Sequence, residues 1–117
     1  FDVGFVTYAN HAKSEILGID IQDLDKSGAV SEEVAMSMAE GCLKRTGADH
    51  AVAVTGIAGP TGGTKEKPTG TVFIGIASQE NPTFVDSFCF KTDRLMFKEK
   101  VSLTAINLLR KRIIGLL

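Results

Sequence analysis

Tryptophan is absent from this chain of 117 residues, tyrosine occurs once, and there are only two cysteines and three prolines. The cysteines, Cys42 and Cys89, lie far apart and fit neither a zinc motif nor the disulfide framework of a small secreted domain. The histidines, His11 and His50, are equally isolated. We therefore expect no metal site, and we expect buried, reduced thiols in a cytoplasmic protein.

The chain also lacks a long apolar run and an excess of charge of either sign. No apolar run approaches the roughly 18 residues that a membrane-spanning helix needs. The N-terminal stretch FDVGFVTYAN has none of the parts of a signal peptide. The whole chain has 13 basic and 14 acidic residues, and its net charge of -1 predicts neither a nucleic-acid partner nor a membrane partner.

What the chain does contain is the composition of a single globular domain. Hydrophobic residues make up 44% and charged residues 23%, both close to the averages for folded domains. The expected elements are a strand over 3–8, a helix over 11–17, a loop over 20–27, a helix over 32–46, strands over 51–54, 71–77 and 84–90, and a final helix from 94. This order predicts an α/β fold, a mixed sheet flanked by helices in a three-layer-like single domain.

Capping residues support the expected helices. Asn10 and Ser31 precede two of them as N-caps, and Gly18 and Gly47 follow them as C-terminal stops. Either Thr92 or Asp93 caps the final helix. The apolar positions of that helix are interpreted as core packing, and they include Leu95, Val101, Leu103, Ile106, Leu109 and Ile113.

The segment from Thr55 to Gly63 is a glycine-rich loop that follows a predicted strand directly. Glycine lets the backbone approach a ligand closely, and clustered amides can bind an anion. The loop is neither a Walker A motif nor a dinucleotide fingerprint. A long hairpin loop rich in turn residues is the alternative, with Lys65, Glu66 and Lys67 forming a solvated tip.

Four stretches together resemble one family. SGAVSEEVAMSMAEG (27–41), GADHAVAVTGIAGPTGG (47–63), KPTGTVFIGIA (67–77) and TDR (92–94) occur in the order and spacing of the C-terminal domain of the competence/damage-inducible CinA family. VTYANHAK (6–13) is similar to the family's preceding segment. The resemblance covers nearly the whole chain.

This resemblance implies a nicotinamide-nucleotide amidase that hydrolyses the carboxamide of nicotinamide mononucleotide. It implies a layered α/β fold, a small-molecule nucleotide as partner, no cofactor and no metal. Active members use a serine nucleophile with a lysine and a tyrosine, and Lys13 and Tyr8 match these two. A desolvated lysine can act as the base, and the tyrosine can relay a proton or hold the oxyanion.

The remaining predicted site residues would bind the nucleotide. Thr55 and the loop glycines Gly56, Gly59 and Gly62 would line its pocket, and Arg94 would meet its phosphate. Each has an alternative interpretation. Tyr8 could be structural at a strand end, Lys13 an exposed helix lysine, Thr55 a strand terminator and Arg94 a solvated residue.

The chain departs from the family in one respect. The family's serine lies in a segment reading approximately Glu-Ser-Cys-Thr-Gly-Gly, and residues 1–117 contain no such segment. We expect an N-terminally incomplete amidase domain that lacks its nucleophile and is inactive alone. The alternatives are a non-catalytic pyridine-nucleotide-binding module and a structural module that forms a homo-oligomer.

Overall fold

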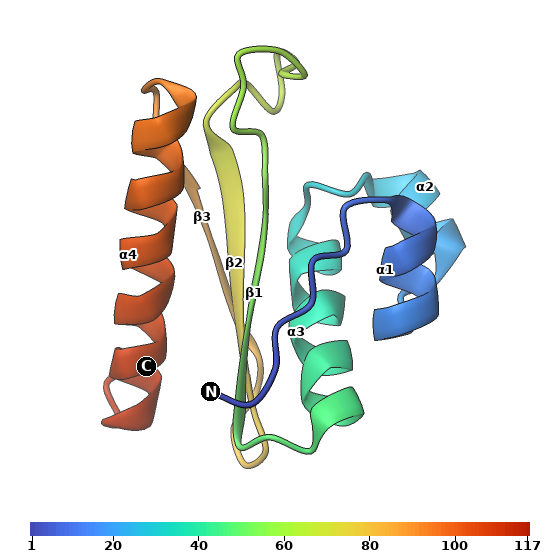
Figure 1. Cartoon of the computed structure of the whole chain (residues 1–117), viewed down its shortest axis with the longest axis vertical. Helices are drawn as coiled ribbons and strands as arrows, with labels where there is room; N and C mark the ends of the chain where they lie inside the picture. The colour runs from blue at the N-terminus through green and yellow to red at the C-terminus, as the bar shows by residue number, and fades with distance from the viewer.

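The computed structural model describes residues 1–117 as a sheet between two layers of helices (Figure 1). The elements are α1 (Asn10–Leu17), α2 (Ile21–Ser27), α3 (Glu32–Thr46), β1 (His50–Gly56), β2 (Thr71–Ser78), β3 (Phe84–Cys89) and α4 (Arg94–Ile113). Helix α4 covers one face of the sheet, and α3 covers the other, with α1 and α2 outside α3. The predicted three-layer α/β domain is confirmed.

The sheet has three strands in the order β1-β2-β3. Both pairings are antiparallel, with Val54 opposite Ile74 and Ile74 opposite Asp86. In this respect the sheet differs from the predicted mixed sheet. The glycine-rich loop joins β1 to β2 and a short turn joins β2 to β3, whereas a parallel neighbour needs a crossover connection of a dozen or more residues.

Strand β2 is buried on both faces. Val72, Ile74 and Ile76 are 0% exposed and face α4. They pack with four buried residues of that helix, Phe97, Val101, Ala105 and Leu108. On the opposite face α3 packs closely where the sheet has small residues, since Ala39 contacts Ala51, Ala53 and Ala77, and Gly75 lies against Ala35 and Ala39. The two faces of β2 therefore fix the separate positions of α3 and α4.

The predicted helix ends are confirmed at most positions. Gly18 and Gly47 end α1 and α3 in the left-handed region, with φ of 73° and 69°. The Ser31 side chain caps α3, and the Asp93 side chain caps α4 by accepting from Met96. Asn10 is not the cap of α1, which begins after Ala9 without a side-chain cap.

Two predictions for the first 27 residues are wrong. Residues 3–8 form no strand, because β-propensity reflects packing within a sheet and this segment pairs with no strand of residues 1–117. Residues 21–27, predicted as a loop, form α2. The Asp20 side chain caps this helix by accepting from the Gln22 amide, and Leu24 anchors it in a buried cluster with Leu17 and Val34.

The interpretation of α4 is partly wrong. Val101 is buried as predicted and Leu109 is partly buried. Four other predicted core positions are largely exposed: Leu95 at 78%, Leu103 at 64%, Ile106 at 66% and Ile113 at 58%. The helix carries apolar residues on two faces, and the sheet covers only one of them.

Candidate functional site

The glycine-rich loop continues β1 beyond the end of the sheet and returns to β2. Its base is closed by backbone hydrogen bonds, from Ile57 N to Thr71 O at 2.8 Å and from Gly70 N to Ile57 O at 2.7 Å. Gly59 and Gly62 have φ of 84° and 95°, which an ordinary side chain rarely adopts. These two positions therefore require glycine for the path of the backbone.

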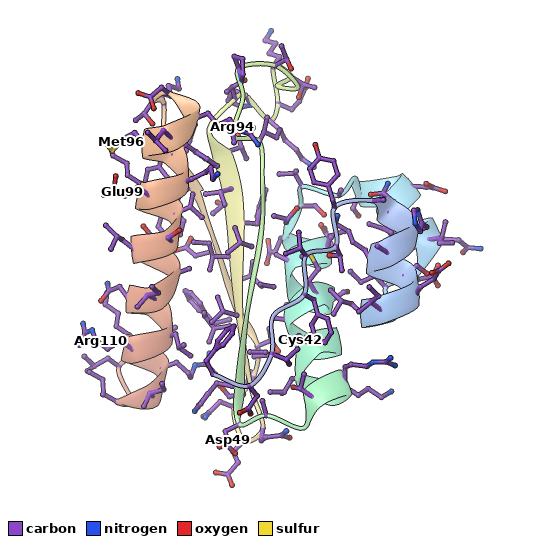
Figure 2. All side chains as sticks on the ribbon, viewed as in Figure 1. Cys42, Asp49, Arg94, Met96, Glu99 and Arg110 are labelled. Carbon is purple, nitrogen blue, oxygen red and sulfur yellow. The ribbon has the colours of Figure 1, made fainter.

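Arg94 links this loop to the beginning of α4. Its Nη1 donates to the carbonyl oxygen of Gly59 at 2.9 Å, and Figure 2 shows Arg94 between α4 and the loop. A cation in the first turn of a helix opposes the helix dipole, and the carbonyl of Gly59 supplies a compensating partner. This bond uses one nitrogen of a guanidinium that has further N–H groups for a ligand.

Thr55 ties the end of β1 to the segment before α3. The threonine is 7% exposed, and its Oγ1 donates to the carbonyl oxygen of Ala29 at 2.6 Å. Lys67 makes a second link of the same kind, because its Nζ donates to the Ser27 carbonyl oxygen at 3.0 Å. The prediction of a solvated tip is therefore wrong for Lys67, and the loop rests on residues 27–29.

Lys13 is buried, with 6% of its surface exposed. Its Nζ donates to the carbonyl oxygens of Thr7 at 2.5 Å and Tyr8 at 3.3 Å. Burial lowers the pKa of the Lys13 amine from its ordinary value, since desolvation disfavours the charged form. The alternative interpretation, an exposed helix lysine, is therefore wrong.

Tyr8 approaches Lys13 through its backbone only. Its side chain is 92% exposed, so the phenol faces solvent while the carbonyl group receives the lysine N–H. The two predicted catalytic residues are thus neighbours in space. Residues 1–117 do not by themselves enclose the phenol in a pocket.

The predicted residues gather at one end of the molecule. Figure 1 shows the glycine-rich loop, the beginning of α4, α2 and the beginnings of α1 and α3 in the upper part of the view. The printed bonds join them in two groups, one made by Lys13 with residues 7 and 8, the other by Thr55, the loop and Arg94. A lysine amine with a lowered pKa can supply a base, and the further N–H groups of Arg94 beside the loop can supply an anion contact.

A cavity of about 800 Å³ lies away from this end, between the N-terminal segment, α3, β1 and α4. Of its 19 lining residues, 14 are hydrophobic, and none is a predicted site residue. No group of three or more His, Cys, Asp or Glu side chains is placed to hold a metal ion. No helix is long and apolar enough to cross a membrane.

Comparison with known proteins identifies the family. The sequence profile of the CinA C-terminal domain matches residues 1–113. The chain belongs to the CinA C-terminal domain family. Among named relatives, a competence-damage inducible protein of Caldicellulosiruptor saccharolyticus is 52% identical over 117 residues, and a CinA-like protein of Chloroherpeton thalassium is 49% identical over 114. The match covers 98% of this chain but only 28% of the first relative.

Solved structures of CinA proteins have the same fold. The competence/damage inducible protein CihA of Agrobacterium tumefaciens superposes with a TM-score of 0.87 at 40% identity, covering 91% of this chain and 65% of that one. The competence damage-inducible protein A of Klebsiella pneumoniae gives a TM-score of 0.86 at 32% identity. The chain therefore spans about two thirds of these CinA structures.

Sequence reasoning named Lys13, Thr55 and Arg94 as candidate site residues but did not predict the backbone groups to which they bond. The acceptors at this end of the molecule include the backbone carbonyl groups of Thr7, Ser27 and Ala29. Because every residue has such a group, the residue type does not indicate which one will accept a bond. Only their positions could have indicated these acceptors. Ser27 and Ala29 belong to the stretch 27–41 that resembles the CinA family, and Thr7 belongs to the stretch 6–13.

Proposed function

We propose that this domain takes part in hydrolysing the carboxamide of nicotinamide mononucleotide, giving nicotinate mononucleotide and ammonia in the cytoplasm. The observation that carries the proposal is the burial of Lys13 with its pKa lowered. An amidase with a serine nucleophile needs a base that can lose its proton, and desolvation shifts the pKa of the Lys13 amine in that direction. The motifs shared with the CinA family supply the substrate class, and the two free cysteines agree with a reducing compartment.

The hydrogen bonds at Lys13 suit a base whose amine is oriented by backbone carbonyl groups. A neutral amine has two N–H groups and one lone pair. Two carbonyl oxygens, those of Thr7 and Tyr8, accept from Nζ, which leaves the lone pair free. The amine is therefore oriented without being neutralised by a carboxylate, and it can accept a hydroxyl proton.

In the proposed reaction the nucleophile is a serine of the Glu-Ser-Cys-Thr-Gly-Gly segment, which residues 1–117 do not contain. Lys13 takes the hydroxyl proton as the serine oxygen bonds to the amide carbon. The tetrahedral intermediate collapses, the C–N bond breaks, and the nitrogen leaves as ammonia with the proton from Lys13. Water then cleaves the acyl-serine ester, with Lys13 again as the base, and releases the carboxylate product.

The other predicted residues have binding roles in this scheme. The exposed phenol of Tyr8 can donate a hydrogen bond to the oxyanion. Arg94 and the loop amides, with Gly59 and Gly62 among them, bind the phosphate of the nucleotide. Gly56, which was predicted to line the pocket, is the last residue of β1 and leads into the loop. Thr55 holds the loop in place through Ala29.

The test compares the 117-residue chain with a longer protein that includes the serine segment, using mass-resolved detection of nicotinate mononucleotide. We expect turnover by the longer protein and none by the 117-residue chain. In the longer protein, Lys13→Met should abolish turnover and Tyr8→Phe should lower kcat, whereas Lys98→Met, at an exposed position of α4, should change neither. A longer, folded protein that leaves nicotinamide mononucleotide intact would refute the proposal.

A further inference from the structure

The face of α4 that points away from the sheet carries a regular apolar stripe. We define the α4 seam as Met96, Glu99, Leu103, Ile106, Arg110 and Ile113. Figure 2 shows Met96, Glu99 and Arg110 on this outer side of the helix. The four apolar members are exposed by 43% (Met96), 64% (Leu103), 66% (Ile106) and 58% (Ile113).

The spacing of the α4 seam is that of a coiled-coil face. Its members follow one another at intervals of three, four, three, four and three residues. This alternation is the a/d pattern by which two helices pack side by side. The buried positions of α4 lie on the opposite side, so pairing through the seam leaves the core undisturbed.

The two charged members of the seam have no counter-charge on their own helix. The residues three and four positions from Glu99 are Leu95, Met96, Ser102 and Leu103, and those from Arg110 are Ile106, Asn107, Ile113 and Ile114. Arg110 donates to the uncharged Asn107 through Nε and Nη2, at 3.1 and 3.0 Å. Both charges are therefore available to a partner.

The seam is complementary to itself when reversed. A two-fold axis between residues 104 and 105 sets Leu103 against Ile106 of a second copy, Met96 against Ile113, and Glu99 against Arg110. Every apolar member meets an apolar member, and each charge meets its opposite. The symmetry repeats all three pairs, as an isologous interface requires.

We propose that the α4 seam is a homodimer interface in which α4 pairs antiparallel with α4 of a second copy. A parallel arrangement would place Glu99 against Glu99 and Arg110 against Arg110, so the charges select the antiparallel one. The seam extends about 26 Å along the helix at 1.5 Å per residue. A contact of this length is small, so the dimer forms reversibly with protein concentration. This inference does not depend on the proposed amidase activity.

Sedimentation equilibrium of the 117-residue chain over a range of concentrations tests the pairing. We expect a monomer–dimer equilibrium. Glu99→Arg and Arg110→Glu should each weaken association by about tenfold or more, because each sets like charges face to face twice. The double variant, E99R with R110E, should restore the affinity, since it exchanges the two charges and rebuilds both pairs.

Lys111→Glu is the matched control, because it changes the net charge as Arg110→Glu does but lies beside the seam. It should dimerise like the parent chain. Leu103→Lys should give a monomer with an unchanged circular dichroism spectrum, because Leu103 is largely exposed and folding does not need it. A chain that is monomeric at all concentrations would overturn the proposal and leave the seam to another partner. A dimer indifferent to both single charge reversals would overturn it as well.

Discussion

The Nζ of Lys13 donates to the backbone carbonyl oxygen of Thr7 at 2.5 Å, across the turn that leads into α1. This bond holds the N-terminal segment against the first turns of the helix, where Lys13 as a whole residue is 6% exposed. The amine bonds to a carbonyl group and not to a carboxylate, so no opposite charge offsets the desolvation of its charged form. The contact therefore fixes the position of the segment, and the burial that accompanies it lowers the pKa of the lysine.

The lowered pKa of Lys13 predicts a pH-dependent stability. Between the folded-state pKa and the ordinary value of 10.5, the unfolded chain binds a proton that the folded chain does not. The free energy of unfolding should therefore rise as the pH increases through this window. Lys13→Met removes the titrating group, and its free energy of unfolding should lack this rise in urea titrations at a series of pH values.

Lys98→Met is the control for the Lys13 prediction. Lys98 is exposed on α4, so this variant should keep the increase of the parent chain. A parent chain whose free energy of unfolding does not change with pH between neutrality and 10.5 would contradict the lowered pKa of the buried Lys13 amine.

Removing the hydroxyl group of Thr55 should destabilise the fold. Thr55→Val keeps the shape of the side chain but leaves the carbonyl of Ala29 without its 2.6 Å hydrogen bond. The loss of one partner of a bond made by a buried side chain costs about 1–3 kcal/mol, which a shift in the urea midpoint would report. Thr61→Val, at an exposed position of the loop, should stay within about 0.5 kcal/mol. Equal effects of the two variants would mean that the bond to Ala29 contributes nothing.

Arg94 should affect binding more than folding. Arg94→Met removes one part-buried hydrogen bond, the one to the Gly59 carbonyl, so the free energy of unfolding should fall by only about 0.5–1.5 kcal/mol. Under the proposed function, the longer protein with this change should show a higher KM for nicotinamide mononucleotide at nearly constant kcat. Arg45→Met, exposed in the last turn of α3, serves as the control for lost charge. An unchanged KM for the Arg94 variant would remove Arg94 from the binding site.

Local chemistry made much of the fold predictable. Ser31 begins a helix through its side chain, and Gly18 and Gly47 end helices with their positive φ angles. The segments 51–54, 71–77 and 84–90, which were predicted as strands, correspond to β1, β2 and β3. The segment 3–8 has the composition of a strand, but a strand needs a partner, which composition does not reveal. Helix α2 was missed because seven residues are too few for a helical period, and its stability comes from the Asp20 cap and from Leu24.

The candidate site residues could be named from the sequence, but their arrangement in space could not be predicted. Lys13 looks like any helix lysine until its burial and its two carbonyl partners are known. Arg94 and Thr55 bond to backbone atoms 35 and 26 residues away, contacts that depend on the tertiary fold alone. The outward face of α4 was interpreted as core for a similar reason, because apolar spacing shows a stripe but not which side the sheet covers.

Gly75 offers a direct test of the close packing between α3 and the sheet. A Cβ at this position would lie 2.7 Å from the carbonyl oxygen of Ala35 and 3.3 Å from the Cβ of Ala39, both in residues that are 0% exposed. Gly75 has no positive φ, so an alanine there meets only a steric obstacle. Because α3 would have to move away from β2, Gly75→Ala should lower the free energy of unfolding by about 1–3 kcal/mol.

Gly4→Ala is the matched change for Gly75→Ala. Gly4 also lacks a positive φ, but its added Cβ would contact only the Phe1 ring, at 3.3 Å, and that terminal side chain is free to turn away. This variant should unfold at the same urea concentration as the parent chain. If Gly75→Ala also left the free energy of unfolding unchanged, the fold would tolerate a displacement of α3 from the sheet. The two links that residues 27–29 make with Thr55 and Lys67, rather than contact with β2, would then be what holds the start of α3 against the glycine-rich loop.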